Sequence, residues 1–293
     1  MLEKNFTKEL TALIQLLDEP DERVYDAIRT RIITMGVDAL PLLEEANNNM
    51  PVPKASVRIE KIINTIRVED VFAKLRSWAK HDSHNLLEAW MLISGFHSPE
   101  DEKESMKKQV DKLYRDIWVE MNSELTALEK IRVVNHVFYE VYRFDALQEK
   151  KPVLPPYLLG NVLRMQKGNP VSLALLYLII VQQLNIPMFG VNLPRHLILA
   201  YMNGNNILPK PVADYREEDV LFYLNPFNKG AVFRKGEIEL FIRQLKIKEQ
   251  ENFFLPCENK VLIRRLLQEL TMLHKKNHNL IMTDAMQTLL KAI

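Results

Sequence analysis

The stretch from Gly168 to Tyr201 reads GNPVSLALLYLIIVQQLNIPMFGVNLPRHLILAY. Its first three residues interrupt the preceding chain, because glycine and proline end regular elements and proline suits the first turn of a new helix. The residues from Val171 to Leu184 are apolar almost all round, which predicts a helix at the centre of a core. Runs rich in β-branched and aromatic residues come next, at 186–191 and 196–201, and predict two strands.

The chain on the C-terminal side of this stretch continues with short elements. Residues 221–224 predict a third strand, which closes on Asn225-Pro226, and residues 237–244 predict a short helix. Leucine and isoleucine at three- and four-residue spacing predict a final helical pair at 258–273 and 279–292. We expect an α+β fold that is mainly α, with a central helix and a small antiparallel sheet.

The chain on the N-terminal side is predicted to be helical throughout. Apolar stripes at 10–17, 24–33 and 39–46 resemble a HEAT-type helical pair, although a helical cap on the rest of the protein is the simpler interpretation of a single copy. A proline-bearing loop at 145–156 separates this region from the segment that contains the central helix and the strands. We therefore divide the chain into a helical region at 1–145, a core at 146–250 and a helical pair at 251–293.

The composition excludes several classes of function. The 293 residues are 47% hydrophobic and 26% charged with a net charge of +1, so no basic footprint indicates nucleic-acid binding. The longest apolar run, Leu173 to Val181, is nine residues and too short to span a membrane. The first ten residues lack the apolar region of a secretory signal, and the lone Cys257 cannot form an internal disulfide. A cytoplasmic location is the resulting expectation.

The order of helix, strand and strand, with a polar residue at the end of each element, is typical of papain-like sites. In such sites the nucleophile lies at a helix N-terminus, where free N–H groups stabilise a thiolate. A histidine on a following strand acts as the base, and a carboxylate or amide on the next strand orients it. Ser172, His196 and Asn225 occupy the corresponding positions here.

At these positions the chain resembles the SirB1 family, which has a transglutaminase-like core. The family's pattern runs L-x-x-V-L-x-x-x-x-G-[IN]-P-[IV]-S-L-A-x-L-Y, then G-V-x-x-P-x-H-x-L, then D-P-F-x-x-G. The matching residues are Leu159, Val162, Leu163, Gly168, Pro170, Ser172, Leu173, Ala174, Tyr177, Gly190, Val191, Pro194, His196, Pro226, Phe227 and Gly230. The text NKVLIRRLLQELTMLHKK also resembles that family's last helical region, which is described as tetratricopeptide-like. The resemblance implies a papain-like fold with a cleft at the start of the central helix.

Two departures from the family's pattern affect the expected chemistry. Active transglutaminase-like proteins carry a cysteine at the helix start, where this chain has Asn169, Pro170, Val171 and Ser172. The resemblance also implies an aspartate in the D-P-F text, where this chain has Asn225. An asparagine can orient a histidine, but it cannot stabilise an imidazolium as a carboxylate does.

We therefore expect a non-catalytic transglutaminase-like protein, a pseudoenzyme that acts as a ligand- or protein-binding, regulatory module with a protein or peptide partner. One alternative is a hydrolase or acyl transferase that uses Ser172, His196 and Asn225, and it requires the Ser172 hydroxyl to lie within hydrogen-bond reach of His196. Another is a helical scaffold whose partner site lies on the N-terminal helices. The simpler interpretation of Ser172 is a capping residue, and that of the Gly168, Asn169, Pro170, Pro194 and Pro226 motif positions is turn geometry. No cofactor, no metal site and no binding to nucleic acid or membrane is expected, and the polar run KHDSHN around His81 and His84 is interpreted as a solvated loop.

Overall fold

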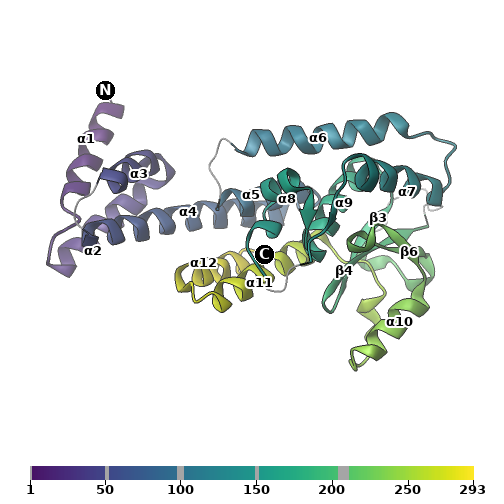
Figure 1. Ribbon diagram of the computed structural model, residues 1–293. Helices are drawn as coiled ribbons and strands as arrows, with labels where there is room; N and C mark the ends of the chain where they lie inside the picture. The colour runs from purple at the N-terminus through teal and green to yellow at the C-terminus, as the bar shows by residue number, and fades with distance from the viewer. Residues whose placement is uncertain (1, 50–52, 98–101, 149–151, 204–210) are drawn as a thin grey trace. The chain divides into compact units, whose positions relative to one another are not determined.

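The computed structural model describes residues 2–49, 53–97, 102–148, 152–203 and 211–293 (Figure 1). Most of them form helices, and one small antiparallel sheet provides the main β-structure, so the predicted α+β, mainly α class is confirmed. The helices are α1 (Leu2–Gln15), α2 (Glu22–Met35), α3 (Leu40–Asn49), α4 (Pro53–His81), α5 (Leu86–Gly95), α6 (Glu102–Glu120), α7 (Ala127–Asn135), α8 (Leu159–Met165), α9 (Pro170–Gln183), α10 (Lys235–Gln244), α11 (Asn259–Lys276) and α12 (Leu280–Leu290). The strands are β1 (Asp145–Ala146), β2 (Lys167–Gly168), β3 (Met188–Leu193), β4 (His196–Met202), β5 (Val220–Asn225) and β6 (Ala231–Phe233).

The contacts within the chain define two compact units, Met1–Arg76 and Ser77–Lys291. The boundary falls inside α4. Both expected boundaries, at 145/146 and at 250/251, lie within the second unit, and the three-part division stays a prediction.

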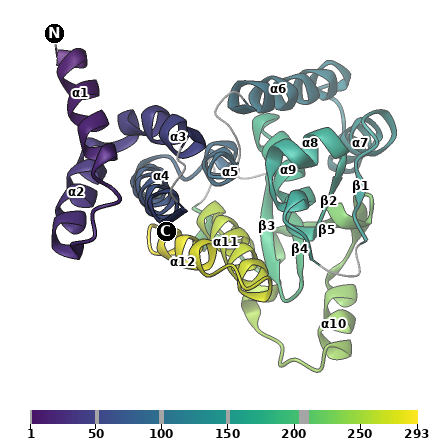
Figure 2. The same cartoon turned by 60° about the vertical axis from the view of Figure 1, so that its left-hand side comes forward.

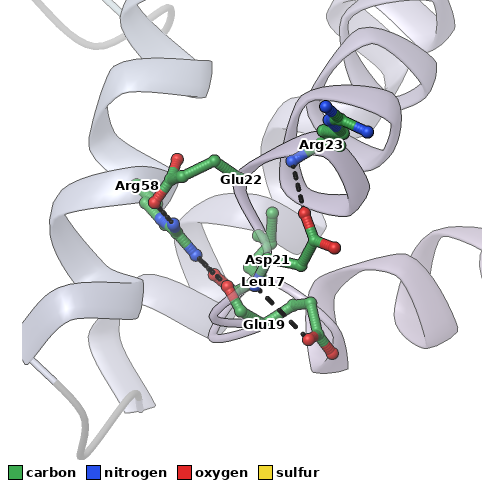
Figure 3. A network of polar contacts seen from close by, with 6 residues as sticks. All are labelled: Leu17, Glu19, Asp21, Glu22, Arg23 and Arg58. Carbon is green, nitrogen blue, oxygen red and sulfur yellow. Dashed lines mark hydrogen bonds and ion pairs between the residues drawn. The ribbon is translucent and has the colours of Figure 1, made fainter.

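The first unit is a helical cluster whose core is made of leucine and isoleucine from α1, α2, α3 and α4. The buried Arg58 of α4 donates from Nη1 to the carbonyl oxygens of Leu17 and Glu19 at 3.0 and 2.7 Å, and from Nη2 to Glu22 at 2.5 Å (Figure 3). Its guanidinium carbon also lies 3.8 Å from the centre of the Tyr25 ring. Arg58 therefore fastens the turn between α1 and α2 to α4, because the carbonyls at the end of α1 find no partner within their own helix.

The second unit is built around α9, in which every residue from Val171 to Val181 is buried. This helix contacts α5, α6, α8 and α11 as well as β3 and β4, as its uniformly apolar sequence predicted. The sheet has the order β3-β4-β5-β6, and each neighbouring pair is antiparallel. The three predicted strands are confirmed with shifts of one or two residues at their ends, whereas β6 was not predicted.

The two faces of the sheet meet different helices (Figures 1 and 2). Val191, Ile198 and Ala200 belong to a core cluster with Ile238 and Ile242 of α10. That cluster contains no residue of α9, although α9 contacts β3 and β4, so α9 covers the other face. The sheet thus lies between α9 and α10.

Candidate functional site

The start of α9 is closed by a capping box rather than open for chemistry. The Asn169 side chain accepts a hydrogen bond from the Ser172 N–H at 2.8 Å, and the Ser172 hydroxyl accepts one from the Asn169 N–H at 2.9 Å. The hydroxyl in turn donates to the Asn169 carbonyl at 3.3 Å, and the Ser172 side chain has no exposed surface. Asn169 is the N-cap and Pro170 is the first helical residue, so the helix begins one residue before the predicted start at Val171. The hydroxyl of Ser172 is therefore engaged both as donor and as acceptor.

His196 is the first residue of β4, and its ring lies on the face that α10 covers. The register pairs His196 with Leu193, and alternation along β4 places it with Ile198. The ring centre is 4.9 Å from that of Phe241 in α10, at an interplanar angle of 75°. Nδ1 of His196 is buried and has no hydrogen-bond partner in the described chain. Burial, and then the charges of Arg265 and Arg195, lower the pKa of His196, which favours the neutral imidazole.

Asn225 ends β5 and starts the short 3-10 helix Pro226–Asn228. Its side-chain oxygen accepts a hydrogen bond from the Phe227 N–H at 3.0 Å, so the amide acts as a local cap. Its carbonyl accepts from the Gly230 N–H at 3.0 Å, which closes the turn into β6. The role of Asn225 seen here is therefore to shape this turn.

The structure places two of the three predicted residues at one end of the sheet, and no hydrogen bond of the described residues joins any two of the three. Because β4 begins beside the end of β5, His196 and Asn225 lie at the same end of the sheet. The hydrogen bond between Ser172 and His196 that the acyl-transferase alternative requires is absent from the bonds of the described residues. The capping box holds the hydroxyl, and strand alternation turns the imidazole toward α10. The assignment of the three residues as ancestral triad positions stays a prediction.

The three glycines that match the family pattern, Gly168, Gly190 and Gly230, lie where a side chain closely approaches the backbone. A Cβ on Gly168 would lie 2.5 Å from the Ser172 hydroxyl, and one on Gly190 would lie 2.7 Å from Leu262 of α11. Gly230 has a φ of +67°, and a Cβ there would lie 2.1 Å from the side-chain oxygen of Asn135. Packing therefore accounts for the glycines at these motif positions.

Pro194 opens the turn between β3 and β4, which the buried Arg265 of α11 holds in place. Arg195, the second turn residue, has a φ of +66°. From Nη1, Arg265 donates to the carbonyls of Leu193 and His196 at 2.6 and 2.9 Å and to the Asn192 side chain at 2.6 Å. Sequence reasoning missed Arg265, because within NKVLIRRLLQEL it is one of two adjacent arginines and only the helical period distinguishes the inward one.

A second network missed from the sequence joins α7, α9 and the turn after Asn225. The Tyr177 hydroxyl donates to Asn135 at 2.9 Å, and the Asn135 amide donates to the Gly230 carbonyl at 3.0 Å. α7 continues as a π-helical turn, His136–Val141, from which Tyr139 donates to the Pro226 carbonyl at 2.7 Å. Burial raises the pKa of both tyrosines, so both hydroxyls stay protonated donors.

Cys257 lies at the other end of α9 from Ser172. It lines a cavity of about 1120 Å³ together with Ile179, Gln182 and Gln183 from the last turns of that helix. Its N–H bonds to the Gly190 carbonyl at 2.8 Å, and burial raises the pKa of its thiol to about 12. Such a thiol is almost entirely protonated near neutral pH, so Cys257 does not replace the missing nucleophile.

The polar run around His84 forms a local pair rather than a cluster. His84 pairs with Asp82 at 3.1 Å, and the described residues contain no group of three or more histidine, cysteine, aspartate or glutamate side chains that could hold a metal ion. Within the same residues, no helix is both long and apolar enough to cross a membrane.

Comparison with known proteins places this fold and site in one class. A family model described as the transglutaminase-like superfamily matches residues 104–268, which is more than half of the chain. The chain belongs to this superfamily.

Its relatives include proteins of two kinds. A UPF0162 protein of Buchnera aphidicola is 29% identical over 140 residues, which are 47% of this chain and 47% of that protein. A UPF0162 protein of Pseudomonas aeruginosa is 29% identical over 128 residues, 42% of this chain and 45% of the relative. The human F-box only protein 21 is 30% identical over 111 residues, 38% of this chain and 17% of that protein. The chain thus spans less than half the length of these curated relatives, and no solved structure matches it.

Proposed function

We propose that this chain is a non-catalytic transglutaminase-like protein of the SirB1 family, which acts in the cytoplasm as a ligand- or protein-binding, regulatory module. The observation that carries the proposal is the state of the α9 N-terminus. A catalytic hydroxyl needs a base that removes its proton, and the Ser172 hydroxyl instead donates to Asn169 and accepts from it. The half-buried Cys257 lies at the opposite end of the helix, and burial raises the pKa of its thiol.

The state of His196 supports the same proposal. A general base must reach the proton that it abstracts, and the imidazole of His196 packs on Phe241 with its buried Nδ1 unpaired. Asn225 directs its side-chain oxygen to the Phe227 N–H, so the amide is held as a local cap of the turn, and no hydrogen bond of the described residues joins it to His196. The helical-scaffold alternative remains open, since it requires only a partner surface on the first unit.

The test is activity-based labelling of the purified chain with a fluorophosphonate, together with a screen for hydrolysis or cross-linking of a peptide library. We expect no covalent adduct and no turnover, because no nucleophile at the start of α9 is activated. A serine hydrolase labelled in parallel shows that the probe is active. The acyl-transferase alternative would replace the proposal if turnover were observed and were lost in both His196→Ala and Ser172→Ala.

A further inference from the structure

A pocket of about 630 Å³ lies beside the β3–β4 turn and α11, away from Ser172 and Asn225. Its volume is within the range of sites that hold small organic molecules. The residues that matter for its chemistry are Tyr157, Arg195, Phe253, Arg265, Met272 and Lys276.

Arg265 is a buried cation with donor capacity that the described residues leave unused. The residue is 8% exposed, its Nε donates to Glu269 at 3.1 Å, and its Nη1 serves the three acceptors of the β3–β4 turn. No hydrogen bond of the described residues uses Nη2. Unlike the buried polar atoms that lack a partner, this atom keeps some accessible surface. Since Arg265 lines the pocket, its two free N–H groups are available to a ligand there.

The rim of the pocket adds positive charge that no ion pair of the described residues neutralises. Arg195 and Lys276 are both exposed, both line the pocket, and neither forms an ion pair within the described part of the chain. Glu269 is the carboxylate that lines the pocket, and it is occupied by Arg265 and by the hydroxyl of Tyr157. The pocket therefore presents an excess of cations to an entering ligand.

The walls around these charges are apolar. Leu193 and Phe253 are buried, whereas Met272 is 63% exposed, which is a large fraction for a side chain of this kind. A ligand with an apolar body would cover Met272 while its charged end reached Arg265. An inorganic anion would leave these walls uncovered.

We propose that this pocket binds a small organic acid, with its carboxylate on Nη2 of Arg265 and its apolar body against Met272 and Leu273. This deepens the proposed ligand-binding function and rests on it. A purely structural role for Arg265 accounts for its Nε and Nη1 bonds, whereas Nη2 and the two rim cations have no partner among the residues that the structure describes. A ligand bound to Arg265 would also be linked to His196 of the candidate site, because Nη1 of Arg265 donates to the His196 carbonyl.

The test uses hexanoate as the acid and hexan-1-ol as the neutral probe with the same carbon chain, titrated into the full chain by calorimetry at low ionic strength. We expect hexanoate to bind about tenfold or more tightly than hexan-1-ol, as charge-assisted hydrogen bonds allow. Arg265→Ala would remove the donor of three acceptors and destabilise the fold. The test therefore uses substitutions of the rim residues Arg195 and Lys276. Arg195→Gln and Lys276→Gln should each weaken hexanoate binding by about two- to fivefold.

Lys275→Gln is the matched control, because Lys275 is the exposed neighbour on the same helix and does not line the pocket. It should leave hexanoate binding unchanged. The proposal is overturned if hexanoate gives no binding heat at millimolar concentration, if hexan-1-ol binds as tightly, or if Lys275→Gln weakens binding as much as Lys276→Gln does. Labelling by fluorophosphonate, with hexanoate binding intact and charge-dependent, would instead overturn the non-catalytic function alone.

Discussion

At the scale of single residues, the start of α9 shows how one position serves structure at the expense of chemistry. The helix N-terminus has free N–H groups that favour an anion, which is why papain-like enzymes place a thiolate there. In this chain Asn169 and Ser172 satisfy those groups with each other. A hydroxyl with two engaged hydrogen bonds and no exposed surface is not presented to a substrate, and no hydrogen bond of the described residues joins it to an imidazole.

The structural role of Ser172 predicts a loss of stability in Ser172→Ala. The substitution removes the cap of the buried Asn169 N–H, and we expect the free energy of unfolding to fall by about 2 kcal/mol in urea denaturation. Thr126→Ala is the control, since Thr126 and Glu129 form the same motif at the start of α7 on the surface, and it should cost about 0.5–1 kcal/mol. Equal losses in the two variants would contradict the assignment of Ser172 as a buried cap.

The sequence could predict part of this geometry. Asn169-Pro170 followed by Ser172 is a helix-start signal by itself, and the structure confirms it. The face toward which His196 points could not be predicted, because alternation fixes only which residues of a strand share a face. Whether α9 or α10 covers that face is decided by packing between segments distant in the chain.

At the scale of elements, the turn from β5 into β6 is fixed by contacts that come from elsewhere in the unit. Asn225 caps its first residues, and Gly230 ends it with a positive φ. The side chain of Asn135 sits against Gly230 and is held by the Tyr177 hydroxyl. The glycine of the family pattern is therefore needed where three elements meet.

Gly230→Ala is predicted to be one of the most damaging small substitutions in the chain. The left-handed conformation costs an alanine about 1–2 kcal/mol, and the new Cβ would overlap Asn135, so we expect a total loss of about 3 kcal/mol or more. Gly236→Ala in α10 is the control, because a Cβ there meets nothing within 4 Å, and it should raise stability by up to about 1 kcal/mol. Urea denaturation of both variants measures the difference, and an unchanged midpoint for Gly230→Ala would refute this account of the motif glycine.

The elements themselves were predicted where their signal is local. The helix at α9 and the strands β3, β4 and β5 are indicated by hydrophobic pattern, and the structure confirms them within about two residues. β6 has three residues, and β1 with β2 has two each, so their pairing depends on partners that a short sequence window does not contain. The π-helical turn after α7 likewise has no sequence signal that we could use.

At the scale of the whole molecule, two compact units have separate cores, and a long amphipathic stretch hides the boundary between them. The helix α4 is continuous across Arg76 and Ser77, where the two units divide. Proline-rich loops are the usual signal of a boundary, and the loop at 145–156 led us to expect one there. A boundary inside a helix is visible only from the contacts that each half of the helix makes.

The larger unit contains a pair of histidines that makes its stability depend on pH. His97, just after α5, stacks on His274 of α11 with ring centres 5.5 Å apart, and the Nε2 atoms of both are buried without a partner in the described chain. Burial, together with the neighbouring His274, lowers the pKa of His97 to about 4, and burial lowers the pKa of His274. In the unfolded chain both imidazoles take up protons near pH 6.5.

The unfolded state therefore binds more protons than the folded state below about pH 6.5, so stability falls as the pH drops from there toward 4 and is nearly constant above it. For His97 the pKa difference corresponds to a loss of up to about 3 kcal/mol, which urea denaturation near pH 7 and near pH 5 would detect in part. The double variant H97L/H274L should reduce this dependence, because leucine keeps the site apolar and cannot be protonated, and the lowered pKa of His196 accounts for a remainder of the same sign. His81→Gln, which removes an exposed imidazole, should preserve it. If the free energy of unfolding depended on pH equally in the double variant and the wild type, groups other than these two imidazoles would cause the loss of stability in acid.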